Sequence, residues 1–302
     1  MRHIVTPAWV AEGYEFPADV MVTLADDLAN LKDVELGSAD FVVLPYDGSS
    51  IDDATLISKM KQVSVIQTLT AGFNSLEHLI PQGVTLCNVS GVHDVATSEM
   101  AVLLTLNALR DFPRIQKAHE RHEWDQFYGQ SLLNKSVLLV GYGDVGKAIH
   151  RRLEGFECQV MPVASHARDA VRGIDELDEL LPGADVIILA VPLNASTENL
   201  IDSRRLGLLK DGALFVSVAR GRVVDQDALL RELNAGRLRA AVDVTTPEPL
   251  PADHQMWSTP NLIIAPHIGA DTDALTPRAR MRIHRQWDLW LAGKPLECVV
   301  VQ

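Results

Sequence analysis

The sequence predicts an α/β protein with two doubly wound parallel sheets, and three observations support this fold class. Short runs of Val, Ile and Leu alternate with amphipathic stretches, as expected of buried parallel strands joined by helices. The length of 302 residues, at roughly 150 residues per domain, predicts two domains. A charged and aromatic segment, 111–134, follows a helical stretch and has no clear period, so we place a domain boundary near residue 95.

The apolar runs define the expected strands in chain order. In the first third of the chain they are 3–6, 41–44, 63–69 and 84–89, and in the remainder 137–140, 159–163, 185–191, 214–219, 239–244 and 262–265. The amphipathic stretches predict helices over 97–110, 145–153, 175–181, 225–235 and 273–291. Asp225 and Asp227 fit the negative first turn of a helix, and Gly236 fits its C-terminal end. Pro162 interrupts one strand, which we expect to end early or to bulge there.

The charge balance and the cysteines argue against several classes of function. Lys and Arg number 27 against 40 Asp and Glu, and this net charge of −13 disfavours nucleic acid and anionic membranes as partners. Cys87, Cys158 and Cys298 show neither a CxxC motif nor metal-ligand spacing, so we expect reduced thiols and no metal. The N-terminus lacks an apolar signal region, and runs such as 186–191 are too short to span a membrane. We therefore expect a cytoplasmic protein.

A glycine motif stands between an expected strand and an expected helix. The strand 137–140 runs into a loop with GxGxxG spacing, formed by Gly141, Tyr142, Gly143, Asp144, Val145 and Gly146. The first glycine permits a tight turn, the second lets the backbone approach a pyrophosphate, and the third lets helix and strand pack closely. The start of such a helix favours an anion. The alternative is a glycine-rich turn without a ligand, but the flanking strand and helix favour a Rossmann-like dinucleotide site.

The end of the next strand bears on the choice of cofactor. An acidic residue usually stands there and holds the ribose 2′-hydroxyl of NAD. This chain has instead Ser165, His166 and Arg168. A carboxylate repels a 2′-phosphate, whereas arginine binds one through two parallel hydrogen bonds, so we expect NADP(H) to be favoured. The alternative is that Arg168 is an ordinary surface arginine and that NAD(H) is the cofactor.

Three further segments place polar side chains after expected strands, at the edge where open α/β sheets bind ligands. Arg220 offers a planar guanidinium suited to a carboxylate, and Arg222 is its nearest competitor. Glu248 lies between two prolines, which restrict its backbone and suit a rigidly aimed carboxylate. His267 directly follows a strand, and an imidazole beside a carboxylate can exchange a proton near neutral pH. The structural alternatives are an ordinary ion pair, an exposed acid and a structural histidine.

Together these motifs resemble the D-isomer-specific 2-hydroxyacid dehydrogenases, among them the glyoxylate and hydroxypyruvate reductases. The resemblance rests on the order and spacing of five segments: 71–74, 141–146, 218–225, 243–249 and 266–269. In order they extend from the first expected domain through the glycine motif to the last expected strand. The set of Arg220, Glu248 and His267 is much more specific to this family than the glycine motif alone.

The resemblance implies a role for each matching residue. Arg220 would bind the substrate carboxylate and polarise the 2-oxo group, while His267 would protonate the developing alkoxide and Glu248 would hydrogen-bond His267. Ala71 and Gly72 would offer backbone N–H groups to the same carboxylate. The residues implied to line the cofactor outside the glycine loop are Val191, Pro192, Thr197, Val218, Ala219, Gly269 and, at the nicotinamide carboxamide, Asp243.

The resemblance also implies how the chain is organised. Residues 1–95, rejoined by about 285–302, would form a flavodoxin-like substrate domain. Residues 96–284 would form a Rossmann domain that binds the dinucleotide, with the active site in the cleft between the domains. Tyr46, which follows the strand 41–44, is a further candidate for the substrate cleft.

Aromatic residues outside these motifs suggest two buried surfaces. Trp124, Phe127 and Tyr128 interrupt a polar stretch, in a region where members of this family build a dimer contact. We therefore expect a homodimer, with local core packing as the alternative for these three side chains. Trp287 and Trp290 stand at helical spacing and predict the buried face of the last helix.

The sequence thus predicts an oxidoreductase that transfers a hydride between a nicotinamide cofactor, NADPH by preference, and a small 2-oxo or D-2-hydroxy acid such as glyoxylate or hydroxypyruvate. A rival within the family is NAD-dependent oxidation of a D-2-hydroxy acid. A rival from another class is a binding protein that senses NAD(P), similar to the corepressors of this family. The acidic charge favours the enzyme over the sensor.

Overall fold

A computed structural model describes residues 1–46, 51–73 and 76–301, and these residues form two compact units. Unit 1 comprises Met1–His93 and Asp273–Gln302, and unit 2 comprises Asp94–Thr272. The chain therefore passes into unit 2 once and returns once. No helix in the described ranges is both long enough and apolar enough to cross a membrane.

The start of unit 2 lies close to the expected domain boundary, whereas its end lies farther from the expected one. The first crossing falls between His93 and Asp94, beside the expected residue 95. The second falls at Asp273 and not near 285, because the whole of the long last helix packs within unit 1. This helix buries Ile283 and Trp287 completely, as predicted, whereas Trp290 of the predicted face is only partly buried.

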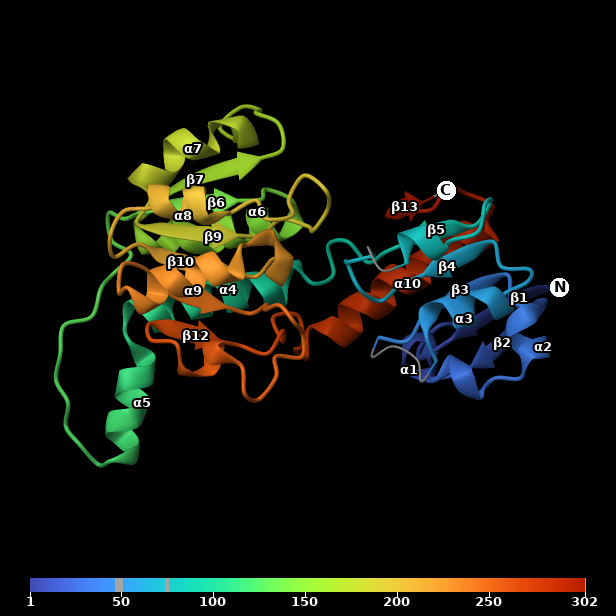
Figure 1. The fold of residues 1–302 in the computed structure, drawn as a ribbon. Coiled ribbons are helices and arrows are strands. Elements are labelled where there is room, and N and C mark those ends of the chain that lie inside the picture. Colours follow the sequence, from blue (N-terminus) through green and yellow to red (C-terminus); the bar gives the residue numbers. More distant parts are fainter. Residues whose placement is uncertain (47–50, 74–75, 302) are drawn as a thin grey trace. The chain divides into compact units, whose positions relative to one another are not determined.

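Unit 1 is a six-stranded sheet in the strand order β13-β5-β4-β3-β1-β2 (Figure 1). Without β13, which is antiparallel to its neighbour, this is the flavodoxin-like order 2-1-3-4-5. The strands are β1 (Arg2–Thr6), β2 (Val20–Leu24), β3 (Phe41–Val43), β4 (Val65–Gln67), β5 (Thr85–Cys87) and β13 (Val299–Val301). The helices are α1 (Ala8–Ala11), α2 (Asp33–Gly37), α3 (Asp53–Lys59) and α10 (Leu275–Leu291).

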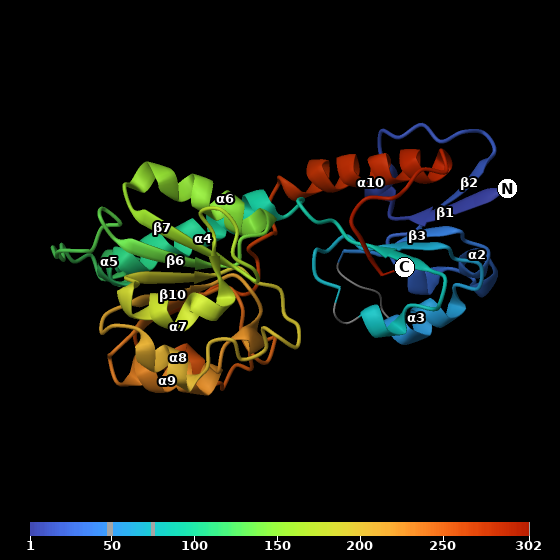
Figure 2. The same ribbon diagram turned by 90° about the horizontal axis from the view of Figure 1, so that it is seen from above.

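Helices cover both faces of this sheet because successive strand residues point to opposite sides. In β3, Val42 packs with Leu36 of α2 and Leu56 of α3. Its neighbour Phe41 packs on the other face with Trp287 of α10. Figure 2 shows α10 on one side of the sheet and α3 on the other. The sequence did not predict β2 or β13, which are both short edge strands with partly exposed side chains.

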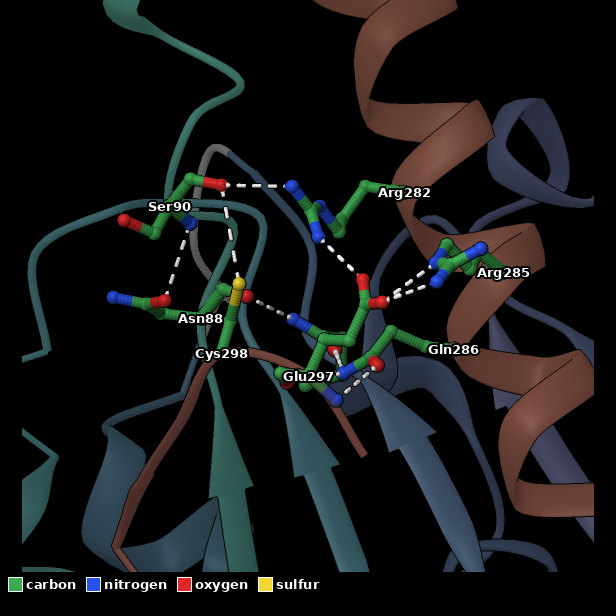
Figure 3. A network of polar contacts seen from close by, with 8 residues as sticks. Asn88, Ser90, Arg282, Arg285, Gln286, Glu297 and Cys298 are labelled. Carbon is green, nitrogen blue, oxygen red and sulfur yellow. Dashed lines mark hydrogen bonds and ion pairs between the residues drawn. The ribbon is translucent and has the colours of Figure 1, made fainter. Parts of the chain in front are cut away.

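Polar side chains of α10 hold the C-terminal strand in place (Figure 3). The buried amide of Gln286 accepts a hydrogen bond from the N–H of Glu297 and donates one to its carbonyl, both at 2.9 Å. The same amide donates to Oε1 of Gln67, another buried side chain, at 3.0 Å. Arg282 and Arg285 bind the carboxylate of Glu297 at 2.7 and 2.6 Å. The chain is thereby fixed where β13 begins, so β13 can pair with β5.

Unit 2 is a seven-stranded, fully parallel sheet in the order β12-β11-β10-β9-β6-β7-β8. This is the Rossmann order 3-2-1-4-5-6 with one more strand, which confirms the predicted fold class. The strands are β6 (Ser136–Val140), β7 (Gln159–Ala164), β8 (Arg172–Gly173), β9 (Val186–Leu189), β10 (Leu214–Ser217), β11 (Arg239–Val242) and β12 (Leu262–Ile264). The helices are α4 (Asp94–Leu109), α5 (Phe112–Glu120), α6 (Asp144–Leu153), α7 (Leu177–Leu180), α8 (Ser203–Leu208) and α9 (Gln226–Asn234).

Pro162 neither ends nor bulges β7, so that prediction was wrong. The strand continues in register with β6 from Gln159 to Val163 and extends to Ala164. The N–H of Gln159 donates toward β6, so by alternation the proline nitrogen faces the other side. On that side β8 pairs with β7 only from Val163 onward, and no hydrogen bond is lost.

The segment that lacks a clear period contains the amphipathic helix α5. This helix and the chain after it stand away from the sheet of unit 2 (Figure 1). The alternative that the aromatic residues beyond α5 pack in a local core is wrong for two of them. Trp124 and Tyr128 are almost fully exposed, at 95% and 104%. Phe127 instead lies 4.3 Å under the guanidinium of Arg114, which also pairs with Asp125. We call residues 112–130 the arm.

Candidate functional site

The glycine loop joins β6 to α6 and has the shape that a pyrophosphate requires. Gly141 has a φ of +106°, and a Cβ there would lie 2.3 Å from the carbonyl oxygen of Ala190. A Cβ on Gly146 would lie 2.0 Å from the carbonyl oxygen of Gly141, so α6 packs directly under the loop. Beside Gly143, at the start of α6, no atom of the described residues other than its chain neighbours lies within 4 Å of an added Cβ. The loop backbone is therefore open where α6 begins, which fits a dinucleotide.

A second loop, 191–197, follows β9 and lies against the glycine loop. The nitrogen of Val191 is 2.9 Å from the position of a Cβ on Gly141. Thr197 closes this loop, because its hydroxyl donates to the carbonyl of Pro192 at 2.6 Å and accepts the N–H of Asn194 at 2.8 Å. Two of the segments predicted to line the cofactor are thus brought together by the neighbouring strands β6 and β9.

The residues after β7 are exposed beside the glycine loop. Ser165, His166 and Arg168 all lie at the surface, directly beyond the end of the strand. Backbone bonds between Arg168 and Val171 form a tight turn. The guanidinium of Arg168 donates to the carbonyl of Tyr142 at 3.2 Å. The positive charge of Arg168 therefore lies next to the loop that would hold a dinucleotide.

Arg220 stands where β10 gives way to a short 3-10 turn, Gly221–Val223. Its guanidinium donates to the carbonyl of Ala219 at 2.6 Å, and within the described ranges no carboxylate pairs with it. Arg222 is bound to Glu198. Of the two neighbouring arginines, Arg220 therefore has the guanidinium that remains available for an acidic ligand.

The carboxylate of Glu248 connects two parts of the site. Its Oε2 lies 2.8 Å from Nδ1 of His267, and its Oε1 accepts the backbone N–H of Thr245 at 2.8 Å. Both oxygens are thus engaged, and the carboxylate is held toward the imidazole. Nε2 of His267 makes no hydrogen bond to any residue that the structure describes, and the side chain is 44% exposed. This nitrogen is therefore free to exchange a proton with a ligand.

The charges around His267 favour its protonated form. The hydrogen bond that His267 donates to Glu248 raises the pKa of His267 above its ordinary value of 6.5, more than burial and the charge of Arg220 lower it. Burial raises the pKa of Glu248, but the bonds from His267 and Thr245 outweigh burial and lower it. Because the pKa of His267 is higher in the folded state, the interaction with Glu248 stabilises the fold fully at pH values below 6.5, the ordinary pKa of histidine. This stabilisation is lost as the pH rises through the raised pKa of His267.

Asp243 anchors the backbone that follows His267. Its two carboxylate oxygens accept the N–H groups of Ile268 and Gly269 at 3.0 and 2.9 Å. These bonds hold His267 in the left-handed region, at a φ of +55°, which is costly for a residue other than glycine. Burial raises the pKa of the Asp243 carboxyl. The sequence does not reveal this task, because the partners are 25 residues apart.

The substrate residues predicted in unit 1 follow β3 and β4, whose carboxyl ends share one edge of that sheet. Tyr46 is half-buried, and its ring centroid lies 6.1 Å from that of His93. Ala71 and Gly72 accept hydrogen bonds through their carbonyls, and their N–H groups donate to none of the described residues. Asn74, which belongs to the same motif, lies outside the described residues.

Known proteins resemble this chain in sequence and in structure. Residues 102–269 match the family model described as D-isomer specific 2-hydroxyacid dehydrogenase, NAD binding domain. The glyoxylate reductase of Thermococcus onnurineus is 31% identical over 237 residues, which cover 73% of this chain and 71% of that protein. The D-3-phosphoglycerate dehydrogenase of Methanocaldococcus jannaschii is 30% identical over 256 residues, 81% of this chain and 49% of that protein. A D-isomer specific 2-hydroxyacid dehydrogenase family protein from Aeromonas salmonicida has a TM-score of 0.87, 25% identity and 99% coverage of both chains.

The substitution Glu248→Gln tests the electrostatics of the pair. It removes the negative charge next to His267, so we expect the pKa of His267 to fall. The titration of the imidazole, followed by NMR, measures this change directly. Glu198→Gln is a matched control, because Glu198 pairs with Arg222 and should leave His267 unaffected. An unchanged titration in Glu248→Gln would contradict the assignment of Glu248 as the residue that sustains the proton.

Proposed function

Since the chain belongs to the D-isomer-specific 2-hydroxyacid dehydrogenase family, we propose that it is an NADPH-dependent reductase of a small 2-oxo acid such as glyoxylate or hydroxypyruvate. The observation that carries this proposal is the set of Arg220, Glu248 and His267 in the same unit as the glycine loop. The similarity to a glyoxylate reductase supports the size of the acid. The residues that would hold the dinucleotide are the glycine loop, the 191–197 loop and Arg168.

The chain's own residues account for the charges that such a reaction moves. When bound, the dinucleotide supplies the hydride that C2 of the 2-oxo acid receives. Arg220 binds the substrate carboxylate and polarises the 2-oxo group, so negative charge on that oxygen is stabilised as it forms. His267 then donates the proton of Nε2 to this oxygen. Glu248 stabilises the imidazolium before the transfer and holds the ring in place.

The preference for NADPH rests on the chemistry at the end of β7. The exposed residues Ser165, His166 and Arg168 offer a hydroxyl, an imidazole and a guanidinium where an acid would bind the ribose of NAD. Because Arg168 lies against the carbonyl of Tyr142, its charge is adjacent to the glycine loop. A 2′-phosphate there would be attracted by the charge of Arg168 and would find hydrogen-bond donors instead of a repelling carboxylate.

A homodimer through the arm completes the proposal. Trp124 and Tyr128 expose nearly their whole side chains, and Phe112 and Ile115 of α5 are also exposed. Exposed aromatic side chains of this kind are typical of residues that dominate binding energy at interfaces. A second copy of this chain would cover them, as the contact expected in this region of the family implies.

Removal of the proton donor tests the reaction. In His267→Ala we expect kcat to fall by on the order of 10²–10⁴, because acid–base catalysis contributes about this much, while the Kd for NADPH stays unchanged. The absorbance of NADPH is followed with glyoxylate, hydroxypyruvate and larger 2-oxo acids. His78→Ala, at an exposed histidine of unit 1, is the control. If His267→Ala keeps most of its kcat, the assignment is wrong. If the unaltered protein binds NADPH but reduces no 2-oxo acid, it is a sensor and not an enzyme.

The substitution Arg168→Ala tests the cofactor preference. Loss of a charge-assisted hydrogen bond to phosphate costs about 1.5–3 kcal/mol, so kcat/KM with NADPH should fall by roughly 10- to 100-fold. With NADH, kcat/KM should change little, because NADH has no 2′-phosphate. Arg172→Ala, an exposed arginine of β8 that pairs with Glu176, is the matched control. A native protein that favours NADH, or an equal loss with both cofactors, would overturn the preference for NADPH.

The double variant Trp124→Ser, Tyr128→Ser tests the dimer. Each buried aromatic anchor of an interface contributes about 2 kcal/mol or more, so the Kd of the dimer should rise by at least about 10²-fold. Sedimentation equilibrium over a range of concentrations measures the average molar mass, from which the Kd of the dimer follows. Trp257→Ser, at another exposed tryptophan of unit 2, should keep the native mass. A monomeric native protein would contradict the proposal.

A further inference from the structure

The segment 245–249 carries Glu248, yet it forms neither helix nor strand. Its internal hydrogen bonds are few: the N–H of Thr245 donates to Glu248, and the hydroxyl of Thr245 donates to the carbonyl of Pro247 at 2.9 Å. These bonds set the shape of the loop but not its position on unit 2. Contacts with other elements therefore help to fix this position, and with it the reach of the Glu248 carboxylate toward His267.

Gln226, the first residue of α9, makes that contact. Its Nε2 donates to the carbonyl of Thr246 at 2.6 Å, and its Oε1 accepts the N–H of the same residue at 2.8 Å. A side-chain amide has both a donor and an acceptor, so one amide can satisfy both backbone groups of one residue. Thr246 lies two positions before Glu248. The amide of Gln226 thus holds the loop through both the N–H and the carbonyl of Thr246.

The helix that carries Gln226 is itself well fixed. Asp225 caps α9, accepting the N–H of Ala228 at 2.9 Å. Leu229 and Leu233 of α9 are buried in the core of unit 2. Gln226 therefore extends toward the loop from a rigid support, which suits a residue that must position another.

A second contact joins the same two segments of the chain. A Cβ on Gly221 would lie 1.9 Å from the carbonyl oxygen of Thr245, so the backbone after Arg220 packs directly against the loop. The segment 220–226 consequently contacts residues 245 and 246 at both of its ends. Through these contacts the position of Arg220 is tied to the position of Glu248.

We propose that Gln226 is a positioning residue, which holds the 245–249 loop so that Oε2 of Glu248 meets Nδ1 of His267. Its effect on catalysis rests on the proposed function, whereas its effect on the imidazole does not. Both hydrogen bonds are accessible to water, so their loss should leave the fold intact. The charged groups that act on His267 are Glu248, Asp243 and Arg220, and Gln226 works through the first of them.

The test uses Gln226→Met, which keeps the length and neutrality of the side chain but loses both hydrogen bonds, together with Gln226→Ala. NMR titration should show the pKa of His267 shifted in the same direction as in Glu248→Gln. As the pH rises, kcat of the variants should decline at a lower pH than kcat of the native enzyme, because their His267 loses its proton at a lower pH. We expect kcat to fall by about tenfold, the effect of a roughly 1.4 kcal/mol loss, with an unchanged Kd for NADPH.

A double variant separates positioning from a merely structural role. If Gln226 acts through Glu248, then Gln226→Met combined with Glu248→Gln should shift the titration of His267 no further than Glu248→Gln alone. Gln255→Ala, at an exposed glutamine of unit 2, should leave the titration unchanged. A native titration in Gln226→Met and Gln226→Ala, or an additive shift in the double variant, would overturn the proposal. The NMR result holds even if no 2-oxo acid is turned over, so failure of the proposed function is distinguishable.

Discussion

In a parallel sheet every strand delivers the loop that follows it to the same edge, and the candidate site of unit 2 depends on this constraint. The glycine loop follows β6, and the 191–197 loop follows β9. Arg220 follows β10, Glu248 lies beyond β11, and His267 lies beyond β12. Segments more than a hundred residues apart in the chain thus reach one edge of the sheet, without direct contacts between them having to bring them together. Short-range interactions then need only adjust the side chains by a few ångström.

Those short-range interactions act mainly on backbone groups. The oxygens of Asp243 hold the turn after His267, and the amide of Gln226 holds the loop before Glu248. The bond between Glu248 and His267 can then form at 2.8 Å between two partly exposed side chains. An exposed ion pair alone contributes little to stability. The loops that carry the two residues are each held by backbone hydrogen bonds, which fix where this pair forms.

The sequence predicts more about unit 2 than about unit 1. The apolar strands β6, β9 and β10 are buried on both faces and therefore read as continuous runs of Val, Ile and Leu. The edge strands β2 and β13 are partly exposed, and their pattern is too weak to be recognised. The prediction at Pro162 was wrong because proline is excluded only where its nitrogen would have to donate to a neighbouring strand. The neighbour on that side, β8, is only two residues long and does not reach Pro162. The helix α5 in the arm was not recognised, since it buries only Ala118 and so lacks a clear apolar period.

The sequence by itself predicted the type of fold, the glycine loop and the candidates Arg220, Glu248 and His267, with Arg222 left as a competitor of Arg220. Each of these follows from local patterns: apolar periodicity, glycine spacing, or a polar residue at the end of a strand. Tertiary structure alone decided which arginine is left unpaired, because Glu198 binds Arg222 through a contact across the fold. It also decided that Asp243 and Gln226 hydrogen-bond to the backbone beside His267 and Glu248, since hydrogen bonds between residues 20 or more positions apart leave no periodic trace in the sequence.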